Sequence, residues 1–274
     1  MVLPFDPDHR LIHSDFNLAL AEKEIFQQYN KRVSIWDKAK TLVRFGGNPD
    51  VNGIEETIWD IGGIETYATG NTIDTISSTD ATDTEIIRIE CHTVVGTGVD
   101  AKFTFVVQTV TLNGQNKVLL PIPVARVSYM ENANSTSLVG DVFVYEDTAI
   151  VAGAPTDLTK AHCKIRGTAD LDQSQKCSTT FSDTDFFIVN FASAGLEAGT
   201  GVDVSADVQF EVMEAGGVFK HRRVFSGVKG STVNQVSPYI IVPRNSDVRI
   251  NCATTSNNIA VTASFSGYLA TVVT

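Results

Sequence analysis

The sequence has few of the features that membrane-spanning or exported proteins carry. Its N-terminus, M-V-L-P-F-D-P-D-H, lacks the basic region and the apolar region of a signal peptide. The longest apolar run, from Val118 to Ala125, is far too short to span a bilayer and contains two prolines. We therefore expect a soluble protein that is made in the cytoplasm and has no membrane partner.

Positive charge is scarce as well. The 21 Lys and Arg residues are outnumbered by 32 Asp and Glu residues, which gives a net charge of -11. Duplex DNA is bound by clustered Lys and Arg, so we expect no nucleic-acid partner. The hydrophobic fraction of 43% is that of an ordinary globular protein, and 274 residues allow one large or two small domains.

Cysteine is rare, with four residues in the chain and no Cys-x₂-Cys or His-x₃-His spacing. Cys91-His92 and His162-Cys163 have the residue types of a metal site, but neighbouring side chains of a strand point to opposite faces. We expect Cys91 and Cys252 on apolar faces and His92 on an outward face. The sequence predicts buried thiols rather than disulfides or a metal site, and no cofactor.

No combination of residues predicts catalysis. There is no G-x-S-x-G motif, and the five histidines lie in unrelated contexts. Acidic residues gather in turns rich in Ser and Thr, where Asp commonly caps loops: Asp80, Asp83 and Glu85; Asp170 and Asp172; Asp183 and Asp185. A calcium ion in one of these loops remains open, and a β-sandwich hydrolase is the enzymatic alternative. We expect that the protein is not an enzyme.

The N-terminal region is predicted to differ from the rest. Residues 1–13 have the prolines of an extended arm, and Ser14 is a suitable N-cap for a helix over Asp15–Tyr29. Turn-forming residues follow after Phe45. We expect residues 1–63 to form an arm with a helix and a linker, followed by a β-sandwich over 64–274, either whole or as two similar β units of about 64–150 and 151–274.

Beyond residue 64 the hydrophobic pattern has a period of two. Such alternation indicates antiparallel strands with one wet face, and the Gly, Asn, Asp, Ser and Thr clusters between them indicate turns. The fold class is therefore predicted to be all-β, an antiparallel sandwich or jelly roll. Alternating segments lie at 87–91, 103–107, 187–191, 204–212, 248–252 and 259–265.

A short internal repeat supports two interpretations. Gly96-Thr97-Gly98-Val99-Asp100 recurs at residues 199–203, and each copy precedes a strand with apolar residues in the same phase. In the first copy we expect Ala101, Phe103, Phe105 and Val107 to face inward. The repeat reflects either shared turn chemistry in two hairpins or a duplication of a β unit. A separate basic run, Lys220-His221-Arg222-Arg223, is predicted to be the exposed part of a strand, either solvated or in contact with an acidic neighbour.

The stretch F-G-G-N-P-D-V-N-G-I-E-E-T-I-W-D-I-G-G, from Phe45 to Gly63, resembles a segment of structural proteins from tailed bacteriophages, in particular short-tailed phages of aquatic hosts such as cyanophages. A looser resemblance covers the C-terminal stretch that begins V-P-R-N-S-D. Gly47 departs from the Arg expected in the phage segment. Glu55 matches the phage segment as well. The matching residues that we consider as candidate assembly contacts are Phe45, Gly46, Asn48, Pro49, Asp50, Glu56, Trp59, Asp60, Gly62 and Gly63.

The resemblance implies a virion protein, above all a capsid cement or decoration protein that forms trimeric knobs on the outer shell. Its expected partners are the major capsid protein and other copies of itself, and its expected location is the capsid surface. Residues 1–45 would then bind the shell, and the Phe45–Gly63 segment would be either an intersubunit contact or merely a link. The alternative is a head or tail fibre, adaptor or receptor-binding protein, for which Tyr67, Tyr129 and Tyr239 would be the exposed aromatic candidates.

Overall fold

The computed structural model describes residues 40–167, 172–197, 204–228, 232–235 and 240–271. These residues form antiparallel strands in several sheets, which confirms the predicted all-β sandwich class. The expected extended arm of residues 1–13, the expected helix over Asp15–Tyr29 and the second Gly-Thr-Gly-Val-Asp copy lie outside the described residues. Within the described ranges no helix is long and apolar enough to cross a membrane.

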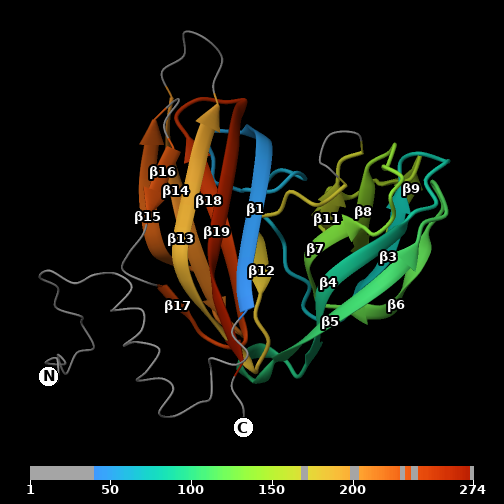
Figure 1. Ribbon diagram of the computed structural model, residues 1–274, viewed down its shortest axis with the longest axis horizontal. Coiled ribbons are helices and arrows are strands. Elements are labelled where there is room, and N and C mark those ends of the chain that lie inside the picture. The colour runs from blue at the N-terminus through green and yellow to red at the C-terminus, as the bar shows by residue number, and fades with distance from the viewer. Residues whose placement is uncertain (1–39, 168–171, 198–203, 229–231, 236–239, 272–274) are drawn as a thin grey trace, which may run out of the picture.

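One sandwich contains both ends of the described chain, and we call it the terminal sandwich (Figure 1). Its first sheet has the order β1-β19-β13-β16, and β17 also pairs with β13. Its second sheet has the order β12-β18-β14-β15, and β2 pairs with β18. The strands are β1 (Lys40–Val51), β2 (Glu56–Thr57), β12 (Ser178–Thr180), β13 (Asp185–Glu197), β14 (Ser205–Glu214), β15 (Lys220–Val228), β16 (Thr232–Gln235), β17 (Ile240–Val242), β18 (Ser246–Thr254) and β19 (Ile259–Thr271).

The second sandwich is inserted between β2 and β12, and we call it the inserted sandwich (Figure 1). Its sheets have the orders β11-β8-β3-β6 and β5-β4-β7, with β9 and β10 as a separate hairpin. Its elements are β3 (Ile73–Ser78), β4 (Ile86–Val95), the 3-10 helix η1 (Gly98–Asp100), β5 (Lys102–Thr111), β6 (Val118–Val124), β7 (Arg126–Asn132), β8 (Val142–Glu146), β9 (Ile150–Val151), β10 (Ala154–Pro155), the 3-10 helix η2 (Leu158–Lys160) and β11 (Ala161–Ile165).

Each sandwich has its own apolar core. Phe187, Phe210 and Phe265 are fully buried in the core of the terminal sandwich. Ile76, Ile89 and other aliphatic residues fill the core of the inserted sandwich. The six alternating segments correspond to β4, β5, β13, β14, β18 and β19, because alternation places one set of apolar side chains on the covered face of each strand.

Of the four residues expected to face inward, Ala101 and Phe103 are buried, at 8% and 3% exposure. The strand β5 nevertheless turns its other face to the core of the inserted sandwich. Its core positions include Val106 and Val110, whereas Phe105 and Val107 are 46% and 43% exposed. Apolar residues occupy both faces of this strand, so alternation alone does not identify the inward face. The side chain of Gln108 is buried despite its polarity because it pairs with the backbone of Ile122 in β6.

The expected domain borders differ from the structure. Residues 40–51 form β1, which pairs with β19 from Lys40 opposite Leu269 to Val51 opposite Ile259, so the expected linker begins inside a strand. The expected border at residues 150 and 151 also falls within the inserted sandwich, because β11 pairs with β8. The glycines and Asn-Pro of this region were interpreted as breakers, but they accompany a register shift in β1 between Asn48 and Val51.

The hairpin between β9 and β10 contains a residue in an unfavourable conformation, which allows a test of the fold. Val151 pairs with Ala154, so the turn is Ala152-Gly153, and both residues have positive φ (46° and 79°). Such turns favour Asn-Gly, because Asn tolerates the left-handed region better than Ala does. We expect Ala152→Asn to raise the free energy of unfolding in urea by about 0.5 to 1 kcal/mol. Ala152→Val should lower it, and the opposite order would contradict this turn geometry.

Candidate functional site

The Phe45–Gly63 segment folds around the carboxylate of Glu56, which is 4% exposed. One carboxylate oxygen accepts hydrogen bonds from Asn48 Nδ2 (3.1 Å) and the backbone of Gly63 (3.0 Å). The other accepts from the backbone and the side chain of Asn52 (3.0 and 2.9 Å). Burial raises the pKa of Glu56, but these hydrogen bonds together outweigh it and hold the pKa below its usual value. Glu56 therefore holds the end of β1 and the loop after it, through Asn48 and Asn52, against the turn at Gly63.

Three glycines and Trp59 complete this unit. A Cβ atom on Gly46 would lie 2.5 Å from the backbone nitrogen of Cys177 and 2.6 Å from the carbonyl oxygen of Ile58. Gly62 and Gly63 have φ of 85° and 68°, and their carbonyl oxygens accept hydrogen bonds from Trp59 Nε1 at 3.0 and 3.1 Å. The glycines are thus required by a close backbone approach and by a turn with positive φ.

Most of the candidate assembly residues are covered by this packing. Asn48, Glu56, Trp59 and Asp60 are buried, and Phe45 is half-buried. Glu55 accepts a hydrogen bond from Asn251 in β18. The exposed residues of the segment are Pro49, Asp50, Gly53, Ile54 and Gly63. Any contact of this segment with another molecule is therefore restricted to the end of β1, the loop after it and the Gly62-Gly63 turn.

Gly46 and Gly47 form a matched pair for a test of this packing. We expect Gly46→Ala to lower the free energy of unfolding by about 1 to 3 kcal/mol, because backbone atoms of Ile58 and Cys177 occupy the space of the new methyl group. A Cβ atom on Gly47 would meet only Thr262 Cγ2, at 3.9 Å, so Gly47→Ala should leave stability unchanged or slightly higher. Urea denaturation measures both, and equal effects would contradict the close approach at Gly46.

The two sandwiches are joined by a buried ion pair that the sequence did not reveal. The ammonium group of Lys176 lies 2.6 Å from Glu65, and the two side chains are 3% and 4% exposed. The same ammonium donates hydrogen bonds to the carbonyl oxygens of Val127 (2.7 Å) and His162 (2.8 Å) in the inserted sandwich. Three acceptors satisfy its three donors, so this lysine has a structural role in the charged form.

Two arginines extend this seam between the sandwiches. Arg126 of β7 binds both carboxylate oxygens of Asp247 in β18, at 3.0 and 3.1 Å, and Asp247 is 1% exposed. Arg44 of β1 binds Glu90 of β4 at 2.7 Å. Each pair has one partner in each sandwich. The side of the β5-β4-β7 sheet that was expected to be wet is therefore partly covered by the terminal sandwich.

His92 lies on the outward face of its sheet, as predicted, but the side chain is buried at this seam and does not meet solvent. The side chain does lie on the face opposite Cys91, but it is only 3% exposed and packs edge-to-face against Phe105 at 5.3 Å between ring centroids. Burial, with smaller contributions from the charges of Arg44 and Arg126, lowers the pKa of His92 to about 3. The imidazole is therefore neutral in the folded protein at ordinary pH.

This neutral histidine predicts a loss of stability in mild acid. His92 has an ordinary pKa of about 6.5 when unfolded, so between pH 6.5 and 3 the unfolded chain binds more protons and unfolding becomes easier as the pH falls. Between pH 7.5 and 5.0 this group alone should remove about 2 kcal/mol of stability. We expect His92→Gln to make the dependence shallower, measured by urea denaturation at both pH values. An unchanged difference between the two pH values would contradict the burial of a neutral imidazole.

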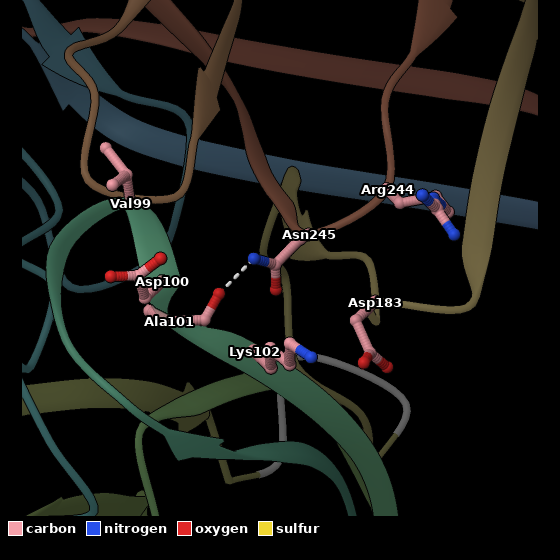
Figure 2. Close-up of a pocket in the computed structure, with 7 residues that line it drawn as sticks. All are labelled: Val99, Asp100, Ala101, Lys102, Asp183, Arg244 and Asn245. Atoms are coloured by element: carbon pink, nitrogen blue, oxygen red, sulfur yellow. Dashed lines mark hydrogen bonds between the residues drawn. The ribbon is translucent and has the colours of Figure 1, made fainter.

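A pocket of about 350 Å³ opens at the same seam. Figure 2 shows Asn245 between the loop that carries Val99 and Asp100 and the side chains of Arg244 and Asp183. The amide of Asn245 accepts a hydrogen bond from the backbone of Phe103 (2.8 Å) and donates one to the carbonyl oxygen of Ala101. Asn245 thereby connects the turn before β18 to β5. The wall residues carry both signs of charge: Asp100, Lys102, Asp183 and Arg244.

The cysteines and the acidic residue Asp83 have structural surroundings. All four cysteines are free and buried, as predicted, and burial raises the pKa of Cys91 and Cys163 to about 11. Asp83 accepts hydrogen bonds from the backbone nitrogens of Val139 (2.9 Å) and Gly140 (3.0 Å), as expected of a loop cap. Among the described residues, no three His, Cys, Asp or Glu side chains are grouped so that they could hold a metal ion.

The basic run and the tyrosines have different surroundings. Lys220, His221 and Arg222 are exposed on β15, as predicted, and His221 lies 3.4 Å from the carboxylate of Glu211. Tyr67 and Tyr129 are only partly exposed, because the guanidinium groups of Arg126 and Arg44 lie over their rings. They do not form the exposed aromatic cluster that a receptor-binding role was expected to show. Tyr239 lies outside the described residues.

Comparisons with known proteins give little guidance. No protein-family model matches the chain, and no curated protein matches it. Solved structures with weak similarity include the VP2 subviral particle of infectious bursal disease virus, at 8% identity and a TM-score of 0.21, over 86% of this chain and 72% of that one. The Gx strain of the same virus gives 9% identity and a TM-score of 0.23, with the same coverage of both chains. Similarity at this level carries no argument about fold or function.

Proposed function

We propose that the protein is a structural component of a tailed-phage virion, and specifically a capsid cement or decoration protein. The observation that carries the proposal is the resemblance of the Phe45–Gly63 segment to phage virion proteins. Its matching residues are not scattered over the surface: Asn48, Glu56, Trp59, Gly62 and Gly63 contact one another. The matching residues therefore belong to one folding unit, which supports the proposal.

The architecture of the described residues supports a mechanical role. Each sandwich has a separate apolar core, and buried ion pairs with partners in both sandwiches fix them to one another. The pairs Lys176–Glu65 and Arg126–Asp247 are shielded from water, so salt screens them less than it screens exposed pairs. Such a body suits a protein whose activity is to hold its shape on a particle.

The proposed partners are the major capsid protein and further copies of this chain, which associate as a trimeric knob on the outer shell. A trimer that docks through several weak contacts at once binds far more firmly than one chain does. The segment available to reach the shell is shorter than the expected residues 1–45, because residues from Lys40 onward already pair with β19. A net charge of -11 suits an exposed surface and supports neither nucleic acid nor an anionic membrane as partner.

The decisive test is the copy number and location of the protein in purified phage particles. We expect hundreds of copies spread over the head, measured by quantitative gel densitometry against the major capsid protein and by antibody labelling in electron micrographs. A dozen copies at one vertex would contradict decoration and favour the fibre or adaptor alternative. If the protein is missing from virions, the virion proposal fails altogether, and the hydrolase alternative regains interest.

A further inference from the structure

Large apolar side chains are exposed along the margin of the inserted sandwich where β5 and β6 meet. We call this margin the β5/β6 edge. Leu119 is 71% exposed, and the other three residues are between 43% and 46% exposed. Exposed apolar residues are unremarkable singly, but a group on neighbouring strands indicates a contact surface. The edge consists of Phe105, Val107, Leu119 and Ile122.

The two strands of this edge lie side by side although they belong to different sheets. The strand β5 is outermost in the order β5-β4-β7, and β6 is outermost in the order β11-β8-β3-β6. Gln108 of β5 bonds both backbone groups of Ile122 in β6, with Nε2 to the oxygen at 3.1 Å and the nitrogen to Oε1 at 3.0 Å. Figure 1 shows both strands on the lower margin of the inserted sandwich.

The β5/β6 edge also lacks charge. Between Phe103 and Ala125 only Lys117 is charged, in a chain of which 19% is charged. The ammonium group of Lys117 lies 2.6 Å from Asp147, so its charge is locally balanced. Val107 lies opposite Glu90 of β4, and the carboxylate of Glu90 is balanced by Arg44 and Arg88. The edge therefore carries no unbalanced charge, on a protein with a net charge of -11.

The chemistry of the edge favours side-chain packing over the addition of a strand. Pro121 and Pro123 remove two backbone donors from β6, which prevents a continuous ladder with another strand. The apolar side chains of Leu119 and Ile122 remain available on either side of Pro121. A partner at this edge is thus expected to bring apolar side chains of its own.

We propose that the β5/β6 edge is the surface through which copies of this chain associate. Two copies that each carry a charge of -11 repel one another over most of their surfaces, and the repulsion is smallest where both surfaces are neutral. At this edge the approach also removes apolar area from water. The location of this self-association surface is inferred from the described residues alone. Only the number of copies, three, rests on the proposed function.

The test compares two glutamate substitutions of nearly equal exposure on the same sandwich. Leu119 at the edge is 71% exposed, and Val151 on the β9–β10 hairpin is 69% exposed. Sedimentation velocity of the full-length protein over a range of concentrations gives its mass. We expect the wild type to be larger than one chain, Leu119→Glu to raise its dissociation constant about tenfold or more, and Val151→Glu to leave it unchanged.

Thermal unfolding establishes that both variants are folded, and Val107→Glu on β5 provides a second edge variant if Leu119→Glu is unstable. A wild type that stays a single chain at every concentration would overturn the inference. So would edge variants that associate like the wild type, or an equal effect of Val151→Glu. Particle copy number is measured separately, so association through this edge without any presence in virions would overturn the proposed function and leave this inference standing.

Discussion

The buried ammonium group of Lys176 is the contact on which the arrangement of the two sandwiches most depends. It lies just before β12, where the chain returns to the terminal sandwich, and it binds Glu65 and the carbonyl oxygens of Val127 and His162. An ammonium group without these acceptors could not remain buried, and a carboxylate at Glu65 without its cation could not either. Since the two cores are separate, this polar junction, together with Arg126–Asp247 and Arg44–Glu90, determines how one sandwich sits on the other.

The Phe45–Gly63 segment connects this junction to the first strand. Trp59 forms an isolated bridge with Lys176, and Cys177 donates to the carbonyl oxygen of Ile58, so the end of the segment pairs with the chain that enters β12. Because Gly46 has no side chain, β1 can lie close to the backbone of Ile58 and Cys177. Glu56 closes the segment between β1 and Gly63 through its hydrogen bond to the backbone of Gly63. A sequence pattern that suggested an external contact therefore has an internal role in joining β1, β2 and β12. The β5/β6 edge adjoins the seam at Phe105, which packs against His92, whereas the ion pair of Lys176 and Glu65 is buried away from it.

The strands and their turns were predictable because their patterns are local. Alternation identified β14 and β18, and it placed Cys91 and Cys252 among apolar neighbours. The strand β1 was missed because its apolar positions are mixed with Arg44, two glycines and Asn48, whose contacts lie outside this strand. The candidate residues of the Phe45–Gly63 segment were identified individually, but their mutual contacts require the turn at Gly62 and Gly63 and the return of the chain at Cys177.

The sequence by itself determined the all-β class, the antiparallel strands and the acidic character of the surface, because side-chain period and charge are properties of the chain alone. Only the tertiary structure decided which polar faces meet water. Glu90 and His92 have the pattern of a wet face, yet Arg44 of the terminal sandwich binds Glu90 on that face. Arg126, which pairs with His92 in the same sheet, binds Asp247 of the terminal sandwich. In β5 the tertiary structure also turned Phe105 and Val107 outward, since both faces of that strand are apolar and the pairing of Gln108 with Ile122 selects the inward one. Contacts between distant segments make these choices, and no local pattern encodes them.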